Sequence, residues 1–437
     1  MGARETALNA LIACRKQGAW SNGVLKDYIV RDGLDRREAA LATRLSYGVL
    51  QNRLLLDFYL QQLLTEKNSK LHPLVRDILH LGLYQLCCMD KIPESAAVNE
   101  SVALAKKYCR KQTYAPGLVN AVLRSGAKKR SALAEPEELS DRYSHPKPLL
   151  SLLESYVGSE RLENMLRANN EAPATVVQVN TLRTTSQELQ QRLEAEGIGA
   201  EPHRWMENCL VLGSTGNLEQ LGSFREGLFY VQDPAAKLSV LCAGLKKGMQ
   251  VLDCCAAPGG KSFAAAMAMG GEGSIRSCDI HSHKTALIQK GAQRLGIGCI
   301  TVHQQDGAAF VEEWKQTMDA VIADVPCSGY GIIRKKPDIR YKDPDTMKEL
   351  PALQLQILSN QARYVKPGGV LLYSTCTLVR RENEGVVEKF LKNNPDFYPE
   401  KLELPSVFPK NETGMLTLVP GEYDTDGFFI CRLRRKA

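Results

Sequence analysis

Residues 251–261 read VLDCCAAPGGK, an apolar run followed by a glycine-rich turn. This order predicts a β-strand, a tight turn and the first residues of a helix. In an open α/β sheet such a turn lies at the carboxyl end of a strand, where ligands bind. The segment therefore predicts both the fold class of this part of the chain and the position of its ligand.

Strands and helices alternate on the carboxyl-terminal side of this segment. The predicted strands span residues 250–253, 274–279, 299–303, 319–324, 369–374 and, near the end of the chain, 427–433. The alternation is typical of a doubly wound, Rossmann-like parallel sheet.

The chain before the sheet has a different pattern. Apolar residues recur every three to four positions between residues 7 and 124, which predicts an all-α domain over residues 1–130. Three prolines mark residues 131–148 as a linker. Residues 149–235 hold two short strand patterns, 176–180 and 210–212, around a helical stretch at 186–196, so we expect a small α/β module there. The sheet domain then occupies residues 236–437.

The composition is that of a globular protein. Of the 437 residues, 44% are apolar and 24% are charged, and the mean hydropathy is −0.25. We expect no membrane segment, because no apolar run approaches about 18 residues. The start of the chain does not have the pattern of a secretory signal. The thirteen cysteines include no CxxC pair, so we expect reduced thiols, a cytoplasmic protein and no metal site.

The net charge of +7 is unevenly distributed. Residues 1–130 contain 21 basic and 11 acidic residues, and residues 101–130 contain eight basic and no acidic residues. A one-sided basic patch attracts the phosphates of a nucleic acid, although a solvated helix face without a partner would have the same composition.

The turn at residues 255–261 excludes two common ligands. A P-loop needs glycine five positions before Gly260, and Cys255 stands there, while the dinucleotide pattern GxGxxG is absent. Asp279, Asp306 and Asp324 close or follow the next three strands and suit a ligand with a ribose and a positive centre. S-adenosylmethionine fits better than NAD, although any one of these acids alone could be a helix N-cap.

Two cysteines, Cys327 and Cys376, follow the strands at 319–324 and 369–374. Carbon 5 of cytosine accepts a methyl group only after a thiolate has added to carbon 6. Such a reaction needs a thiolate, an acid beside the ring and a base or release helper. Cys376, Asp324 and Cys327 match this list, but the chemistry alone does not rank the two cysteines.

Motifs along nearly the whole chain carry a resemblance to a known family. They are VNESV (98–102), VNAVLR (119–124), SHP (144–146), VNTL (179–182), YVQDP (230–234), DVPCSGYG (324–331), PDIR (337–340), STC (374–376) and DGFF (426–429). With them the chain resembles the RNA (cytosine-C5)-methyltransferases of the Fmu/Sun type. It is most similar to the bacterial RsmB-type members, which act on 16S ribosomal RNA and have a NusB-like N-terminal domain.

This resemblance implies a class I methyltransferase core that uses S-adenosylmethionine and releases S-adenosylhomocysteine. It implies that Cys376 is the nucleophile, that Cys327 assists release and that Asp324 is the acid. The cofactor would be bound by Cys255, Ala256, Ala257, Pro258, Gly259, Gly260, Lys261, Asp279, Asp306 and Asp324. The expected RNA-binding residues are Lys106, Lys107, Arg110, Lys111 and Arg124.

The expected partner is 16S rRNA, either free or early in subunit assembly, bound by a monomer. Two alternatives remain open at this point. One is an RNA-binding, antitermination-type factor whose methyltransferase half is vestigial. The other is the same chemistry on transfer RNA.

Overall fold

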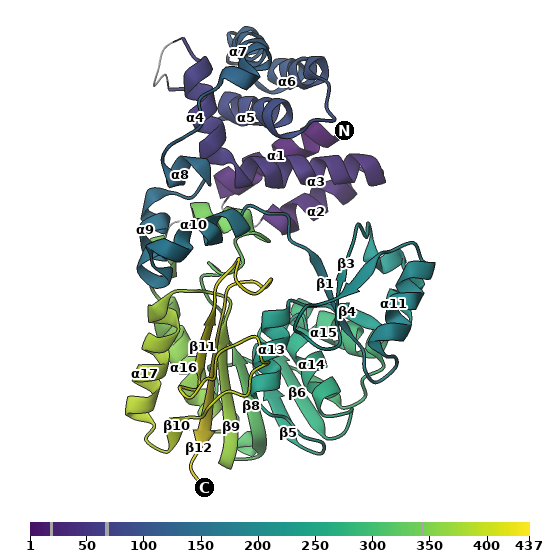
Figure 1. Ribbon diagram of the computed structural model, residues 1–437, viewed down its shortest axis with the longest axis vertical. Coiled ribbons are helices and arrows are strands. Elements are labelled where there is room, and N and C mark those ends of the chain that lie inside the picture. Colours follow the sequence, from purple (N-terminus) through teal and green to yellow (C-terminus); the bar gives the residue numbers. More distant parts are fainter. Residues whose placement is uncertain (18–20, 66–69, 343) are drawn as a thin grey trace. The chain divides into compact units, whose positions relative to one another are not determined.

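The computed structural model describes residues 1–17, 21–65, 70–342 and 344–437 (Figure 1). It divides into two compact units. Residues 1–171 and 333–343 form unit 1, and residues 172–332 and 344–437 form unit 2. Every helix in these ranges is too short or too polar to span a lipid bilayer.

Unit 1 is helical, as the apolar spacing predicts. Its helices are α1 (Ala3–Gln17), α2 (Ser21–Arg31), α3 (Arg36–Gln51), α4 (Arg53–Leu63), α5 (Pro73–Cys88), α6 (Glu94–Tyr108), α7 (Ala115–Lys129), α8 (Leu139–Arg142), α9 (Lys147–Val157) and α10 (Ser159–Ala168). Local signals set the boundaries: the Asp35 carboxylate accepts hydrogen bonds from the first amides of α3, and Pro73 begins α5. Helix α5 is the centre of the bundle, with Ile78, Leu79 and Leu83 fully buried. Residues 131–148, where we expect a linker, contain the short α8.

Unit 1 also includes a short segment from far along the chain. Residues 333–343 follow the loop that carries Cys327, and they form a 3-10 turn, Pro337–Tyr341, among the helices. The Arg340 guanidinium is buried and donates to the carbonyl oxygens of Gln51, Tyr143, Ser144 and Asn169 and to the side-chain oxygen of Asn170. A buried cation is stabilised here by neutral acceptors, and no pattern in the sequence indicates this docking.

Replacing Arg340 with methionine is expected to destabilise unit 1 by about 3 kcal/mol, because several buried carbonyl groups lose their donor. Hydrogen-exchange mass spectrometry checks this: exchange in α10 and in residues 141–145 should become faster, while the strands Gln250–Asp253 and Met318–Asp324 of unit 2 should not change. Arg37→Met, at an exposed position on α3, is the control. Unchanged protection of α10 would contradict the anchoring role.

Unit 2 begins with a small sheet in the order β2-β3-β1-β4. Its strands are β1 (Thr175–Val179), β2 (Ala200–Pro202), β3 (Cys209–Leu212) and β4 (Phe229–Val231), and all of their pairings are antiparallel. Helix α11 (Ser186–Ala195) packs on them and starts with a capping box formed by Thr185 and Glu188. The short α12 (Gly222–Arg225) precedes β4. These elements lie within residues 149–235, where we expect a small α/β module, but residues 149–171 hold the rest of α9 and α10 and belong to unit 1.

The large sheet has the order β10-β12-β9-β8-β5-β6-β7, with β11 paired to β12. Its strands are β5 (Gln250–Asp253), β6 (Ser274–Asp279), β7 (Ile300–Gln304), β8 (Met318–Asp324), β9 (Val365–Thr375), β10 (Phe397–Pro399), β11 (Met415–Leu418) and β12 (Phe428–Arg435). Five strands are parallel, close to their predicted ranges, but β12 runs antiparallel to β9, so the sheet is mixed.

Helices cover both faces of the large sheet (Figure 1). They are α13 (Pro234–Cys242), α14 (Gly260–Ala268), α15 (Ser282–Leu295), α16 (Leu350–Ala362) and α17 (Glu384–Asn393). Alternate residues of each strand face opposite helices: Ala320 and Ile322 pack with α13–α15, whereas Val321 and Ala323 pack with α16 and α17. Since the strands from β5 to β9 are parallel, their carboxyl ends meet at one edge of the sheet, and the candidate site residues of unit 2 lie there.

Candidate functional site

The glycine-rich turn connects β5 to α14 as predicted. Gly259 has a φ of 113°, and a Cβ atom on it would lie 2.4 Å from the Phe263 ring. A Cβ atom on Gly260 would lie 3.0 Å from the side-chain nitrogen of Gln232. Only glycine fits these two positions, and the first amide groups of α14 therefore remain available to a ligand.

The three acidic residues lie at or just after the carboxyl ends of β6, β7 and β8. Asp279 accepts a hydrogen bond from the His281 amide at 3.0 Å, and Asp306 accepts one from the Ala308 amide at 2.9 Å. The second oxygen of each carboxylate has no partner in the described ranges. A Cβ atom on Gly307 would lie 3.7 Å from the Cys255 sulfur, so the turn after β7 approaches the turn after β5. Adjacent unpaired carboxylate oxygens suit the hydroxyl groups of a ribose.

A fourth acidic residue, Asp253, ends β5 and was missed by the sequence interpretation. It is fully buried, and burial raises its pKa to about 7. The Ser262 hydroxyl donates to one carboxylate oxygen at 2.7 Å and in turn accepts from Ser277. Its position beside the Cys255–Lys261 turn, as the last residue of a buried strand, is the signal that could have identified it.

The raised pKa of Asp253 predicts a pH dependence of stability. An unfolded aspartate ionises near pH 4, whereas folded Asp253 remains protonated until about pH 7. The free energy of unfolding should therefore fall between these values by up to about 1.4 kcal/mol per pH unit. Urea unfolding at pH 5 and pH 7.5 checks this, since Asp253→Asn should remove this contribution. An equal pH dependence in wild type and variant would contradict the assignment.

The two predicted cysteines lie side by side. The Sγ atoms of Cys327 and Cys376 are 3.2 Å apart, at the ends of β8 and β9. Backbone bonds connect their loops: the Gly331 amide donates to the Cys376 carbonyl at 3.0 Å, and the Gly427 amide donates to the Gly331 carbonyl at 2.8 Å. A Cβ atom on Gly331 would lie 2.0 Å from the Gly427 oxygen, so this approach requires glycine.

The two thiols differ in their surroundings. The hydrogen bond with Cys376, together with burial, raises the pKa of Cys327 well above its usual value. Cys327 therefore keeps its proton and is able to donate it toward Cys376. The Lys261 ammonium interacts electrostatically with Cys376. The chemistry alone did not rank the two thiols, and Cys376 is the nucleophile that the family resemblance implies.

Asp324 is held between two partners. One carboxylate oxygen lies 2.6 Å from the Lys261 ammonium, and the other accepts from the Ser374 hydroxyl at 2.8 Å. Burial is the largest single influence and lowers the pKa of Lys261, but the attraction and hydrogen bond to Asp324, together with the nearby Asp253 and Cys376, outweigh it, so the net pKa is above the usual value. The site thus contains a short ion pair between Lys261 and Asp324, next to the two thiols.

Glu382 is a further residue that sequence reasoning missed. Its buried carboxylate accepts from the Ser328 amide at 2.9 Å and from the Gln354 side chain at 3.1 Å, which holds the loop after Cys327 in place. The neighbouring Asn383 bonds Thr375 at 2.6 Å on the other side of Cys376. The polar run that follows Cys376 is the only signal in the sequence. Within the described ranges, no group of three or more His, Cys, Asp or Glu side chains could hold a metal ion.

The predicted RNA-binding residues belong to unit 1, on and between α6 and α7, and all five are exposed. Lys107 lies 2.5 Å from Glu5 and Arg124 bonds Asn120 at 2.9 Å, whereas Lys106, Arg110 and Lys111 have no partner in the part of the chain that the structure describes.

Three family models match the chain. Residues 1–128 match the NusB family, residues 145–219 match the ferredoxin-like domain of RsmF/B-like methyltransferases, and residues 241–434 match the 16S rRNA methyltransferases RsmB/F.

Curated relatives align over most or all of the chain. The probable ribosomal RNA small subunit methyltransferase B of Bacillus subtilis is 37% identical over 99% of this chain and 98% of its own. The Synechocystis protein of the same description is 32% identical over the full length of both chains. Ribosomal RNA small subunit methyltransferase B of Vibrio cholerae is 33% identical over 92% of this chain and 90% of its own.

Solved structures share the fold. The crystal structure of PH0851 covers 98% of both chains with a TM-score of 0.80 at 24% identity. A methyltransferase homolog from Pyrococcus horikoshii covers 67% of this chain and 95% of its own, with a TM-score of 0.58 at 26% identity. NSun6 from the same organism, solved with SFG, covers 67% of this chain and 98% of its own, with a TM-score of 0.59 at 19% identity. The relatives that match from end to end confirm the resemblance seen in the motifs, and the chain belongs to the RsmB/F family of 16S rRNA methyltransferases.

Proposed function

We propose that the protein transfers a methyl group from S-adenosylmethionine to carbon 5 of a cytosine in 16S rRNA, through a covalent adduct with Cys376. The 3.2 Å separation of the Cys327 and Cys376 sulfurs, beside the Asp324–Lys261 pair, is the observation that carries the proposal. Family membership supports the substrate class.

The reaction begins with addition of the Cys376 sulfur to carbon 6 of the cytosine. The added electron pair moves toward ring nitrogen 3, so the ring needs a proton donor there. The Lys261 ammonium lies 2.6 Å from Asp324, and we propose that a proton passes from Lys261 through Asp324, which we place against the ring, to nitrogen 3. Carbon 5 then becomes nucleophilic enough to accept a methyl group.

Release requires that solvent water take the proton of carbon 5, that the electron pair of that C–H bond re-form the double bond between carbons 5 and 6, and that Cys376 leave carbon 6 as a thiolate. The proton on nitrogen 3 returns through Asp324 to Lys261. A thiolate leaves more readily when a hydrogen-bond donor faces it. Burial and the bond to Cys376 hold the proton on Cys327, whose sulfur is 3.2 Å from the departing atom. Cys327 therefore stabilises the leaving group.

The cofactor would be held by the turn from Cys255 to Lys261 together with Asp279, Asp306 and Asp324. The unpaired oxygens of Asp279 and Asp306 fit its ribose hydroxyls, and the amides at the start of α14 fit its polar groups. When bound, it supplies an electrophilic methyl group on a sulfonium centre. The site needs no metal in this mechanism. NSun6, solved with SFG, has the same core fold.

We assign RNA binding to unit 1. The NusB-family match and the exposed cations at Lys106, Arg110 and Lys111 support this assignment. We further propose that one monomer acts on 16S rRNA that is free or at an early stage of assembly.

Methylation of defined RNAs tests the proposed function. The protein is incubated with labelled S-adenosylmethionine and 16S rRNA from a strain that lacks it, and 5-methylcytosine is mapped. Label at one cytosine is expected. Label on transfer RNA alone would favour the second substrate class. RNA binding without any label would favour the vestigial alternative.

Substitution of Lys106, Arg110 and Lys111 by glutamine is expected to weaken RNA binding and flatten its salt dependence. Each lost phosphate contact should lower the slope of log K against log salt by roughly 0.7 for a single strand. Filter binding at several salt concentrations measures this. Substitution of Lys16, Lys26 and Arg37, which carry equal charge elsewhere in unit 1, is the control. Equal slopes in the two triple variants would mean that the α6–α7 face is only a solvated surface.

A further inference from the structure

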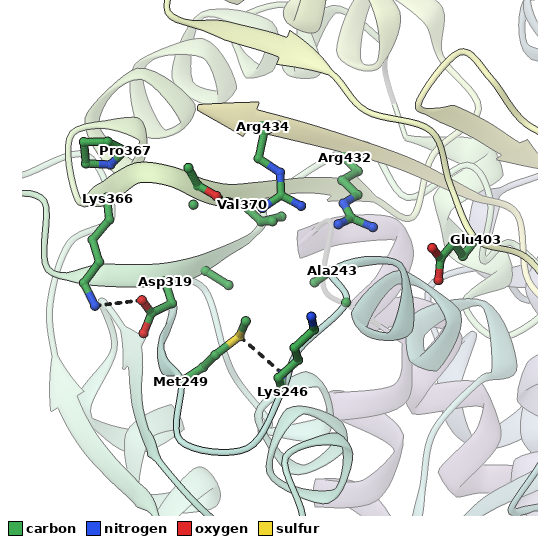
Figure 2. Close-up of a pocket in the computed structure, with 14 residues that line it drawn as sticks. Ala243, Lys246, Met249, Asp319, Lys366, Pro367, Val370, Glu403, Arg432 and Arg434 are labelled. Atoms are coloured by element: carbon green, nitrogen blue, oxygen red, sulfur yellow. Dashed lines mark hydrogen bonds and ion pairs between the residues drawn. The ribbon is translucent and has the colours of Figure 1, made fainter. Parts of the chain in front are cut away.

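A cavity of about 400 Å³ opens at the edge of the large sheet opposite the cysteines, at the amino ends of β5, β8 and β9 (Figure 2). Four basic and two acidic side chains line it: Lys246, Lys366, Arg432, Arg434, Asp319 and Glu403. Small and apolar residues make up the rest of the lining. Neither the methyl-transfer mechanism nor the family assignment uses this cavity.

Two of the basic groups are engaged by the protein itself. Lys366 lies 2.7 Å from one oxygen of Asp319, whose other oxygen accepts from the Gln250 amide at 2.7 Å. Arg434 lies 2.7 Å from Glu400 and donates to the Gly368 carbonyl at 2.7 Å. Lys366 and Arg434 are therefore already paired with carboxylates of the protein, and we assign them to the wall of the cavity and not to its binding groups.

Arg432 is different because most of its donors are unused. Its side chain is only 12% exposed, and its Nε atom lies 2.7 Å from the Glu400 oxygen that also pairs with Arg434. That approach is not aligned for a hydrogen bond. The two terminal nitrogens have no hydrogen-bond partner in the described ranges. Gly244, with a φ of 64°, leaves space beside them, since a Cβ atom there would lie 3.4 Å from Nη2.

Lys246 is the second unused cation. Its backbone amide contacts the Met249 sulfur at 3.3 Å, and its ammonium group has no ion-pair partner among the residues described. Figure 2 shows Lys246 reaching toward Arg432 from the opposite wall, while Glu403 lies at the side. The four basic groups face three carboxylates, those of Asp319, Glu403 and Glu400, so one positive charge remains uncompensated. Glu403 is exposed, and solvent screens its charge.

We propose that this cavity binds a phosphate group with a single negative charge, held by the terminal nitrogens of Arg432 and the ammonium of Lys246. A guanidinium fork and an ammonium are the usual phosphate ligands in proteins, and one surplus charge matches a phosphodiester. The volume lies in the range of small-ligand sites. The source of the group is either the backbone of an RNA strand or a small free phosphodiester.

Binding of dimethyl phosphate tests the chemistry without RNA. The methyl resonance of Met249, which lines the cavity, reports occupancy in methionine-labelled full-length protein, and Met249→Leu assigns it. Lys246→Gln is expected to weaken binding about fivefold, as for one charge-assisted hydrogen bond. Lys247→Gln, which removes the adjacent lysine paired with Glu272 outside the cavity, should have no effect.

Binding of oligouridylate identifies the source. This RNA has no cytosine, so the methyl-transfer site does not select it. The slope of log K for oligouridylate binding against log salt is compared between the two variants. A lower slope for Lys246→Gln than for Lys247→Gln assigns the cavity to the RNA backbone. If the two salt slopes are equal but dimethyl phosphate shifts the Met249 methyl resonance, the cavity is assigned to a small phosphodiester. If neither readout separates the two variants, the proposal is wrong, even if the protein methylates rRNA.

Discussion

Replacing Cys376 with alanine is expected to abolish methyl transfer, with a loss of rate of at least about 1,000-fold, as for other covalent nucleophiles. Without its sulfur no adduct forms at carbon 6, and carbon 5 remains unreactive. The neighbouring Cys327 cannot substitute, because burial favours its neutral thiol form. Single-turnover transfer of labelled methyl to 16S rRNA measures the effect.

The control for this variant is Cys299→Ala, which removes a half-buried thiol next to β7 of the same sheet. It should retain full activity. Cofactor binding and RNA binding by Cys376→Ala should also match wild type, since the removed sulfur belongs to neither contact. Full turnover by Cys376→Ala would overturn the covalent mechanism, while the family assignment would stand.

The turn and the two cysteines could be predicted from sequence because each follows directly from a strand. A strand such as residues 319–324 has an apolar pattern that locates its end, and in a parallel sheet all such ends share one edge. Residues that follow these strands are therefore expected to lie at the same edge of the sheet, however far apart they are along the chain. Asp279 and Cys376 are nearly 100 residues apart, yet this rule places both at the carboxyl edge.

Glu382 and Arg340 could not be predicted in this way. Glu382 is a charged residue in a polar run, the usual pattern of a solvated loop, and its burial depends on the Ser328 amide and the Gln354 side chain. Arg340 is buried against the carbonyl groups of Gln51 and Ser144, which precede it by 289 and 196 residues. Burial of a charge depends on partners that only the tertiary structure supplies.

The direction of β12 in the sheet also could not be predicted from the sequence. Its apolar pattern predicts a strand, but the pattern is the same for parallel and antiparallel pairing. The structure pairs Phe429 with Thr375 in antiparallel register, which brings Gly427 against Gly331. Because β12 is antiparallel to β9, Gly427 bonds to Gly331 and holds the loop that contains Cys327 against the end of β9. The distance between the two sulfurs depends on this contact.

A second thiol 3.2 Å from the nucleophile explains why the enzyme would need both cysteines. Addition to the ring consumes the thiolate on Cys376, and the reverse step must regenerate it. The hydrogen bond from Cys327 is present at 3.2 Å before the reaction and is available again when the sulfur departs. Glu382 supports this geometry through Ser328, without contacting either sulfur itself.

Replacing Cys327 with alanine should therefore leave methyl transfer intact and trap the product. The methylated RNA should remain joined to Cys376, and turnover should stop after about one cycle, because the departing thiolate loses its hydrogen-bond donor. Denaturing gel electrophoresis with labelled RNA detects the adduct as a band of higher mass that contains both protein and RNA.

The double variant Cys327→Ala/Cys376→Ala separates this trapping from other causes of tight binding. It should form no denaturant-stable adduct, because the sulfur that makes the bond is absent. Cys327→Ser should release RNA faster than Cys327→Ala, since a hydroxyl group restores a donor at the same position. If Cys327→Ala instead turned over at the wild-type rate, the sulfur 3.2 Å from Cys376 would have no part in release. If the double variant still formed the adduct, Cys376 would not be the residue that attacks the ring.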